Sequence, residues 1–396
     1  MPSAKTESGS KIRVLHLITR LIKGGADENT ILTIRGLKKE DYEVDLMIGG
    51  ESDYNFIENL DDIKPILVNE LRRNINPAKD FIAFYRIYNY IKKHDYTIIH
   101  THTAKAGFLG RLAAKCAGTP VIIHTLHGIT FHNFLNIIVK NIYIFLEKWV
   151  GKFTDKFITV GDDIKQKYIA KHIAEPDKYI TIRSGFDLQQ FIQTGTLSHT
   201  ERSFERQRIG LKPTDIVIGS VSRLEPRKGH IHLIEAASKI VTQNQRIKFL
   251  IVGEGSYRTY LEDEVRRRNL TNWIMFLGYR SDIARIMALF DIFVLTSLWE
   301  GLPRVLVQAA ALGKPIVTFD VEGAREVVVH EKNGFIIPAK NESKLIERLL
   351  WLSQHIDRAQ QMGLMGKNLI NESWDYRVMV QQINNLYQEL LLRIKR

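Results

Sequence analysis

Two short segments of the sequence place charged side chains directly after apolar runs. The first, residues 222–230, has the sequence SRLEPRKGH and follows the run IVIGSV. Within it, Arg223 and Lys228 bracket a proline turn. Cations at the carboxyl end of a strand can offset the charge of a departing diphosphate, arginine through its planar fork and lysine as a point charge. A solvated basic turn has the same pattern, so this segment gains weight only beside the second one.

The second segment, residues 297–304, has the sequence SLWEGLPR between the run DIFVLTS and the apolar stretch VLVQAAALG. A strand that turns tightly into a helix leaves backbone N–H groups and the positive end of the helix dipole facing a phosphate or diphosphate. Pro303 suits the first turn of that helix. Glu300 falls at the carboxyl edge of the strand, where open α/β sheets bind their ligands, and it favours a hydroxylated ligand. Its alternative role is a helix cap.

The elements that must position these segments are short apolar runs that alternate with longer amphipathic stretches. Such alternation predicts parallel sheets with helices between the strands. The first series of runs is RVLHLI, EVDLMIGG, IIHTHT, PVIIHT, KFITVG and YITIRS, and the second is DIVIGSVSRL, RIKFLIVGEG, WIMFLGY, DIFVLTS, KPIVTFD and NGFIIPAK. A polar stretch after Gly185 separates the two series and predicts a boundary near residues 190–200.

Length and pattern together predict two doubly wound, Rossmann-like domains. At 396 residues the chain exceeds what one hydrophobic core usually supports. We expect residues 1–10 to be a disordered lead without an export signal, residues 11–195 to form a first domain and residues 196–375 a second. The segment 376–396 needs a groove in which to dock, because it has apolar residues at helical spacing: Val378, Val380, Ile383, Leu386, Leu390 and Leu391.

Charge and cysteine content narrow the partners and the compartment. The balance of 56 Lys and Arg against 44 Asp and Glu gives a formal charge of +12, which attracts anionic partners. The basic residues are spread through many helices without a nucleic-acid motif, so we expect no nucleic-acid partner. The single cysteine, Cys116, cannot form an intramolecular disulfide. Its neighbours Ala113, Ala114 and Ala117 predict a small buried filler, and a reducing compartment fits.

One bulky stretch, residues 131–156, mixes apolar side chains with lysines. Polar residues such as Asn136, Lys140 and Glu147 interrupt it, which argues against a membrane-spanning helix. The pattern fits a helix that lies on a membrane surface and receives a lipid-linked acceptor. It fits ordinary core packing with a solvated lysine face equally well.

Histidines and glycines elsewhere carry weaker signals. His100, His102 and His124 fall at strand ends without Cys or carboxylate partners at ligand spacing, so no metal site is expected. His102 and Lys105 could contact an acceptor, with a structural role as the equal alternative. Neither KGGA at 23–26 nor GEG at 253–255 completes the Gly-x-Gly-x-x-Gly pattern of a dinucleotide site.

Taken as a set, these motifs resemble the retaining glycosyltransferase family 4. The matching segments are KGGA at 23–26, His127-Gly128, SRLEPRKG at 222–229, GEG at 253–255, Phe276-Leu277-Gly278, Glu300 to Gln308, Gly323-Ala324-Arg325-Glu326 and Asn333-Gly334. The resemblance spans nearly the whole chain. It implies the GT-B fold, in which two Rossmann-like domains with parallel sheets face a central cleft and a C-terminal helix crosses back to the first domain.

The resemblance also implies roles for individual residues. Arg223, Lys228, Glu300 and His127 would be the catalytic residues; Gly24, Gly25, Gly301, Leu302, Pro303 and Arg304 would approach the donor diphosphate and sugar; Gly278, Tyr279 and Arg280 would line the nucleobase. Gln308 stands where the family has a glutamate that holds the ribose hydroxyls. An amide loses the charge-assisted form of that hydrogen bond, so we expect nucleotide binding to be weaker by about 1 kcal/mol.

The implied activity is transfer, with retention, of a hexose or N-acetylhexosamine from a nucleotide-diphosphate sugar, with UDP favoured over GDP. The acceptor would be a glycan or a polyprenyl- or lipid-linked molecule in surface polysaccharide, lipopolysaccharide or glycolipid synthesis. We expect no cofactor and no metal, and a cytoplasmic enzyme at the inner face of the membrane with peripheral contact to anionic lipid. The alternatives are a nucleotide-sugar epimerase of the same fold and a non-catalytic sugar- or lipid-binding relative.

Overall fold

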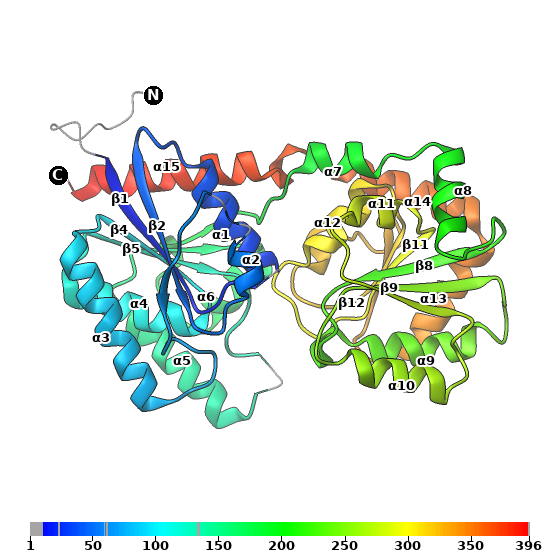
Figure 1. The fold of residues 1–396 in the computed structure, drawn as a ribbon, viewed down its shortest axis with the longest axis horizontal. Coiled ribbons are helices and arrows are strands. Elements are labelled where there is room, and N and C mark those ends of the chain that lie inside the picture. The colour runs from blue at the N-terminus through cyan, green and yellow to red at the C-terminus, as the bar shows by residue number, and fades with distance from the viewer. Residues whose placement is uncertain (1–10, 23, 59, 61, 133–134, 395–396) are drawn as a thin grey trace. The chain divides into compact units, whose positions relative to one another are not determined.

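The computed structural model describes residues 11–394 except 23, 59, 61 and 133–134. The expected lead at 1–10 and the side chain of Lys23 therefore lie outside the described residues. The chain forms two compact units: Met1–Phe186 together with Asp375–Arg396, and Asp187–Trp374. Each contains a parallel sheet covered by helices, so the predicted pair of α/β domains is confirmed (Figure 1).

The first unit is built on a parallel sheet of seven strands among the described residues, in the order β3-β2-β1-β4-β5-β6-β7. The strands are β1 (Ile12–Ile18), β2 (Tyr42–Gly49), β3 (Ile66–Val68), β4 (Ile98–His102), β5 (Val121–Leu126), β6 (Lys156–Thr159) and β7 (Tyr179–Thr181). The helices are α1 (Gly25–Gly36), α2 (Tyr54–Glu58), α3 (Pro77–His94), α4 (Ala104–Ala117), α5 (Ile137–Gly151), α6 (Asp162–Ala170) and α15 (Tyr376–Ile394), with a short 3-10 turn at Pro176–Lys178. The strand order reverses between β1 and β4, so ligands are expected at the carboxyl ends of these strands.

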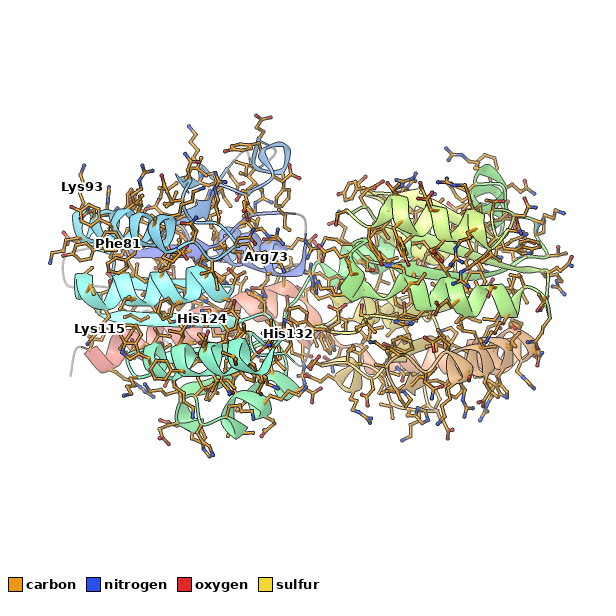
Figure 2. All side chains as sticks on the ribbon, turned by 90° about the horizontal axis from the view of Figure 1, so that it is seen from below. Arg73, Phe81, Lys93, Lys115, His124 and His132 are labelled. Carbon is orange, nitrogen blue, oxygen red and sulfur yellow. The ribbon has the colours of Figure 1, made fainter. Side chains whose placement is uncertain are left out.

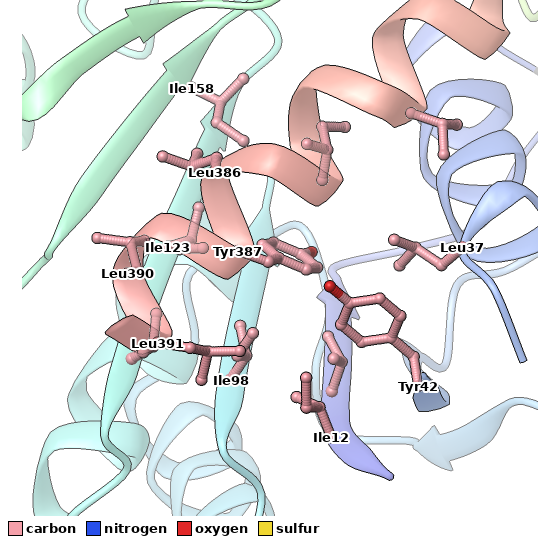
Figure 3. Close-up of a cluster of buried hydrophobic side chains, with 14 of the residues drawn as sticks. Ile12, Leu37, Tyr42, Ile98, Ile123, Ile158, Leu386, Tyr387, Leu390 and Leu391 are labelled. Atoms are coloured by element: carbon pink, nitrogen blue, oxygen red, sulfur yellow. The ribbon is translucent and has the colours of Figure 1, made fainter. Parts of the chain in front are cut away.

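Each face of this sheet packs against different helices, because alternate residues of a strand point to opposite sides. One face carries Leu15, Leu17, Ile99 and Ile122 and is covered by α3 and α4. The opposite face carries Ile12, Val14, Ile98, Val121 and Ile123 and is covered by α15 (Figure 3).

Helix α15 lies on the first unit, although nearly two hundred residues of the second unit precede it in the chain. Of the apolar side predicted for it, Val380, Ile383, Leu386, Leu390 and Leu391 are buried. Val378 is partly exposed, while Met379 and Tyr387 join the core instead. The predicted face is therefore displaced around the helix at its beginning.

The second unit contains a parallel sheet of six strands among the described residues, in the order β10-β9-β8-β11-β12-β13. The strands are β8 (Ile216–Val221), β9 (Ile247–Val252), β10 (Ile274–Gly278), β11 (Ile292–Leu295), β12 (Ile316–Phe319) and β13 (Gly334–Ile337). The helices are α7 (Leu188–Gly195), α8 (His199–Arg208), α9 (His230–Ile240), α10 (Arg258–Arg267), α11 (Ile283–Ala288), α12 (Arg304–Ala311), α13 (Glu342–Gln354) and α14 (Ile356–Leu369), with 3-10 turns at Pro226–Lys228, Ala324–Glu326 and Glu372–Trp374. Here the order reverses between β8 and β11.

Two expectations need correction. The units divide after Phe186 rather than after residue 195, because α7 packs against α11 and α12 of the second unit. Cys116 is exposed on the outer side of α4, whereas Ala113 and Ala114 are buried. The alanines face the sheet and the cysteine does not, so the prediction of a buried filler is wrong.

Candidate functional site

The two segments singled out by their chemistry meet in the second unit. Residues 222–229 follow β8 and residues 296–303 follow β11, and these strands are neighbours at the reversal of strand order. The backbone of the two loops is joined, because Leu298 N donates to the carbonyl of Arg227 at 2.8 Å. The carboxyl edge of this sheet therefore presents both segments at the place where open α/β sheets bind ligands.

An ion pair between Lys228 and Glu300 connects the loops. Lys228 Nζ donates to Glu300 Oε1 at 2.5 Å, and the two side chains are only 12% and 9% exposed. Burial alone would raise the pKa of Glu300, but the positive charges of Lys228 and Arg227 hold it below its ordinary value. Burial lowers the pKa of Lys228, and the attraction of Glu300 opposes that shift. Glu300 is thus an ionised acceptor and is poorly suited to act as an acid.

Further cations surround the pair. Arg223 Nη1 lies 3.4 Å from Glu225 Oε1, and Arg227 Nε donates to Glu225 Oε2 at 2.9 Å. Burial would raise the pKa of Glu225, yet Arg223 and Arg227 keep it low. The Arg227 guanidinium also lies over the Trp299 ring, 5.5 Å from its centroid. Two carboxylates therefore orient three cations at this edge, which suits the binding of an anion.

Glycines let these loops approach one another. Gly229 has φ of 64°, and a Cβ there would lie 2.1 Å from the carbonyl oxygen of Thr296. Gly253 has φ of 137°, and its Cβ would lie 2.0 Å from the carbonyl oxygen of Ser222. The GEG segment thus supports the loop that carries Arg223, which is a packing reason for a pattern that fails as a dinucleotide motif.

The start of α12 borders the same edge. Gly301 and Leu302 lie in the turn, Pro303 is the N-cap residue and Arg304 is the first helical residue, so Pro303 stands one position before the helical turn predicted for it. Gln308 follows Arg304 by four residues and shares its partly exposed side of the helix. The helix therefore presents its N-terminus, Arg304 and Gln308 along one line.

The residues expected at the nucleobase lie farther along the edge. Gly278 ends β10 with φ of 67°, and its carbonyl accepts from Gly253 N at 2.8 Å. Tyr279 is 52% exposed. Arg280 donates to both carboxylate oxygens of Asp282, at 2.8 and 2.6 Å, so its guanidinium already has an anionic partner.

In the first unit, the glycine loop follows β1 and a strained threonine follows β4, the two strands at the other reversal of strand order. Gly24 is the N-cap of α1 and Gly25 its first residue. After β4, Thr103 has φ of 62° and ψ of 161°, which is rare for a β-branched residue. Its hydroxyl lies 2.7 Å from the Thr19 hydroxyl, and Thr19 Oγ1 accepts from Ala106 N at 3.0 Å. These contacts tie the ends of β1 and β4 together.

His127 follows β5, and its Nε2 lies 3.0 Å from Nδ1 of His102. The predicted position of the histidines at strand ends holds only for His102, since His100 and His124 lie inside β4 and β5. All three are buried. Lys105, the other proposed acceptor contact, donates to Asp80 Oδ1 at 2.6 Å.

Sequence reasoning missed several of these features. The pairing of Glu225 with two arginines, the strain at Thr103 and the involvement of His16 were not predicted. The histidines did carry a signal: residues 100 and 102 share one face of a strand by alternation, and the register places His16 opposite His100.

The chain matches known families in both units. Residues 23–190 match the family described as Glycosyltransferase Family 4, and residues 201–368 match Glycosyl transferases group 1. One relative, the UDP-Gal:alpha-D-GlcNAc-diphosphoundecaprenol alpha-1,3-galactosyltransferase of Escherichia coli, is 31% identical over 396 residues, which cover 97% of this chain and 98% of that protein. The putative glycosyltransferase EpsF of Bacillus subtilis is 26% identical, covering 79% of this chain and 80% of EpsF.

Solved structures share the fold. Anabaena Alr3699/HepE in complex with UDP-glucose superposes with a TM-score of 0.80 at 22% identity, covering 96% of this chain and all of that one. Sucrose-phosphate synthase from Thermosynechococcus elongatus also gives a TM-score of 0.80, at 18% identity, with 97% of this chain covered. At these identities the likeness concerns the fold, and it agrees with two parallel-sheet domains of the GT-B kind.

Proposed function

Because this chain belongs to glycosyltransferase family 4, we propose that it transfers a hexose or N-acetylhexosamine from a UDP-sugar to a lipid-linked acceptor, with retention at the anomeric carbon. The observation that carries the proposal is the set of cations at the strand reversal of the second sheet, where Arg223, Lys228 and the N-terminus of α12 border one edge. The choice of UDP and of a lipid-linked acceptor rests on the E. coli relative, whose name specifies both.

The proposed reaction begins with departure of the diphosphate. As the bond from the anomeric carbon to phosphate oxygen lengthens, negative charge grows on the diphosphate, and Arg223, Lys228 and the backbone N–H groups from Gly301 to Arg304 stabilise it. The acceptor hydroxyl attacks the oxocarbenium-like sugar from the same face. Its proton passes to the leaving phosphate oxygen, so no carboxylate needs to form a covalent intermediate.

Glu300 has a supporting role in this scheme. It is ionised and hydrogen-bonded to Lys228, so it orients the lysine and can accept a hydrogen bond from a sugar hydroxyl. Gln308 would hold the ribose, and Gly278, Tyr279 and Arg280 the base, where Arg280 must share its guanidinium with Asp282. From the first unit, Gly24, Gly25 and His127 would contact the donor sugar.

Calorimetric titration with UDP and GDP tests the donor site. We expect UDP to bind and Arg223→Ala to abolish detectable binding. Arg246→Ala is the matched control, because Arg246 lies at the amino end of β9, where its Nε donates to the carbonyl of Thr214. Loss of binding in both variants, or in neither, contradicts the assignment of the diphosphate site.

Product analysis tests the reaction. Incubation with UDP-galactose or UDP-N-acetylglucosamine and a synthetic GlcNAc-diphosphate lipid should yield a disaccharide whose new linkage keeps the α configuration of the donor. An inverted product refutes retention. Conversion of the donor to an epimer without acceptor would favour the epimerase reading, and binding of UDP-sugar without turnover would favour a non-catalytic binder.

The first unit also offers a surface for the acceptor's membrane. The described helices include none that is long and apolar enough to cross a bilayer. On α5, however, Ile138, Ile142, Phe145 and Trp149 recur at intervals of four, three and four residues and are 67%, 52%, 68% and 42% exposed. These four side chains therefore do not pack in a core, whereas Phe131 and Val150 of the same stretch are buried.

Neighbouring helices extend this face. Helix α4 lies between α3 and α5, and α3 exposes Phe81 at 69% and Tyr85 at 57%. Lys93 of α3 and Lys115 of α4 are exposed on the same layer (Figure 2). Exposed apolar side chains together with lysines on one layer complement an anionic membrane surface, so we propose that this layer contacts anionic lipid.

Vesicle sedimentation tests the contact. The protein should sediment with vesicles that contain anionic phospholipid and much less with neutral ones, and Phe145→Ser should weaken the binding. Phe204→Ser is the control, because Phe204 of α8 is 60% exposed on the second unit. Self-association that Phe145→Ser abolishes, without vesicle binding, would assign the face to a second copy of the chain instead.

A further inference from the structure

A chain of hydrogen bonds runs from His127 into the interior of the first unit. His127 Nε2 lies 3.0 Å from His102 Nδ1, and His102 Nε2 lies 2.9 Å from His16 Nδ1. The other ring nitrogen of His16, Nε2, lies 3.3 Å from the hydroxyl of Tyr387. A residue at the edge of the sheet is thus connected through β4 and β1 to helix α15.

The chain of hydrogen bonds continues from Tyr387 of α15 to a second histidine and a threonine. The Tyr387 hydroxyl also lies 2.6 Å from Nδ1 of His100, and His100 Nε2 lies 2.6 Å from the hydroxyl of Thr125 on β5. Both ring nitrogens of His16, His100 and His102 are therefore engaged. Thr125 is one end of the chain and His127, two residues along the same strand end, is the other.

The buried imidazoles of this chain are neutral. Burial lowers the pKa of His16 to about 3 and those of His100 and His102 well below the ordinary value. A neutral imidazole has one N–H donor and one acceptor nitrogen. Each ring that donates on one side must accept on the other, so the hydrogen bonds of the chain all run in the same direction.

The hydroxyl of Thr125 determines in which direction the hydrogen bonds run. Thr125 is 2% exposed, and among the described residues its hydroxyl has one hydrogen-bond partner, His100 Nε2. If the hydroxyl only accepted from His100, its own proton would be buried without a partner, which is costly. If it donates instead, His100 donates to Tyr387, Tyr387 to His16, His16 to His102, and His102 to Nε2 of His127.

We propose that this chain of hydrogen bonds is a positioning device that holds His127 in the tautomer protonated at Nδ1. Its positioning residues are Thr125, His100, Tyr387, His16 and His102. An Nδ1–H group is a hydrogen-bond donor, so the hydrogen bonds would fix which ring nitrogen of His127 donates and which accepts. The tautomer follows from the first unit alone, whereas the contact of that N–H with the donor sugar rests on the proposed function.

The same histidines could instead hold a metal ion, since ligand atoms of His16, His100 and His102 all lie within 4.8 Å of one another. Two nitrogens bound to one tetrahedral zinc at about 2.0–2.1 Å would be roughly 3.3 Å apart. The separation of 2.9 Å between His16 Nδ1 and His102 Nε2 is instead that of a hydrogen bond. The chain therefore describes this arrangement better than a shared metal does.

The first test measures the tautomer without any substrate. Long-range ¹H–¹⁵N NMR of the full-length protein, labelled at histidine, reports which ring nitrogen carries the proton. The variant His127→Gln assigns the His127 signals. We expect Nδ1 of His127 in the wild type and a mixture of tautomers in Tyr387→Phe. Tyr42→Phe is the matched control, because the Tyr42 ring lies beside that of Tyr387 (Figure 3). The Tyr42 hydroxyl bonds Asn384 and Gln388 of α15 and, among the described residues, no histidine. A proton on Nε2, or the same tautomer in all three proteins, overturns the proposal.

The second test changes the start of the chain and applies even if Tyr387→Phe fails to fold. Thr125→Val removes the hydroxyl and should disturb the His127 tautomer, whereas Thr125→Ser keeps the hydroxyl and should restore it. With UDP-galactose as donor, kcat/KM should fall by about fivefold in Thr125→Val, the loss of one hydrogen bond, and recover in Thr125→Ser. An altered tautomer without any change in transfer would support the hydrogen-bond chain as the cause of the tautomer but refute its role at the sugar. An unaltered tautomer in Thr125→Val would refute the proposal that these hydrogen bonds set the tautomer.

Discussion

Replacing Lys228 by methionine should expose the cost of an uncompensated charge at the candidate diphosphate site. The lysine and Glu300 are 12% and 9% exposed, and removing one partner of a buried ion pair typically costs about 3–5 kcal/mol. We expect the lower end, about 3 kcal/mol, because Arg227 also attracts Glu300. For a domain of this size that corresponds to a fall in Tm of roughly 6–12 °C.

The stability lost in Lys228→Met should depend on pH in a defined direction. In the wild type the pKa of Glu300 is lowered, so the pair contributes stability at neutral pH and loses it as the pH falls through that lowered pKa. In Lys228→Met burial remains while the nearest cation is gone, so the pKa of Glu300 rises. The variant then becomes less stable as the pH rises through the raised pKa. The difference between the two proteins should therefore be larger at pH 7.5 than at pH 5.

Urea denaturation and calorimetry on the wild type, Lys228→Met, Glu300→Gln and the double variant measure these effects. The double variant should regain at least half of the stability without regaining UDP affinity, since the buried charge is gone but so is the cation. Lys248→Met is the control, because Lys248 of β9 donates to the carbonyl of Asn272. Wild-type stability in Lys228→Met, or losses that simply add in the double variant, would refute this reasoning.

Three further changes test other parts of the structure. Gln308→Glu should tighten UDP binding by about fivefold in calorimetric titration, because a carboxylate accepts the ribose hydroxyls more strongly than an amide; equal or weaker binding contradicts the ribose assignment. Gly253→Ala should destabilise the second unit and weaken UDP binding in the same titration, because its Cβ would lie 2.0 Å from the carbonyl oxygen of Ser222; unchanged affinity would show that the loop tolerates the displacement. Arg111→Met should cost about 3 kcal/mol in urea denaturation, because it leaves the buried carboxylate of Glu147 uncompensated, and Arg111→Met/Glu147→Gln should recover much of it.

The sequence predicted the features that depend on local pattern. Alternating apolar runs and helices indicated two parallel sheets, and the loops after IVIGSV and DIFVLTS indicated where an anion would bind. Both rest on rules that operate over a few residues, namely strand and helix periodicity and the position of ligands at the carboxyl ends of parallel strands. These rules could not predict the ion pair of Lys228 with Glu300, because it joins residues 72 positions apart.

Features that depend on register or on the choice of a face were predicted less well. Cys116 and Ala113 differ by three positions in one helix, and only the placement of α4 against the sheet decides which of them is buried. The bond between His16 and Tyr387 joins residues 371 positions apart. Such contacts follow from the register of β1 with β4 and from the docking of α15, and neither is encoded in a short stretch of sequence.

The return of α15 to the first unit has a consequence for the order in which the protein can fold during synthesis. The second unit is a continuous stretch, Asp187–Trp374, and can close its core as soon as that stretch has left the ribosome. The first unit is made earlier but cannot finish, because Ile12, Val14 and Ile98 remain uncovered until α15 is translated. The half of the enzyme that begins translation first is thus the half that matures last, and it must keep an apolar sheet face from aggregating in the meantime.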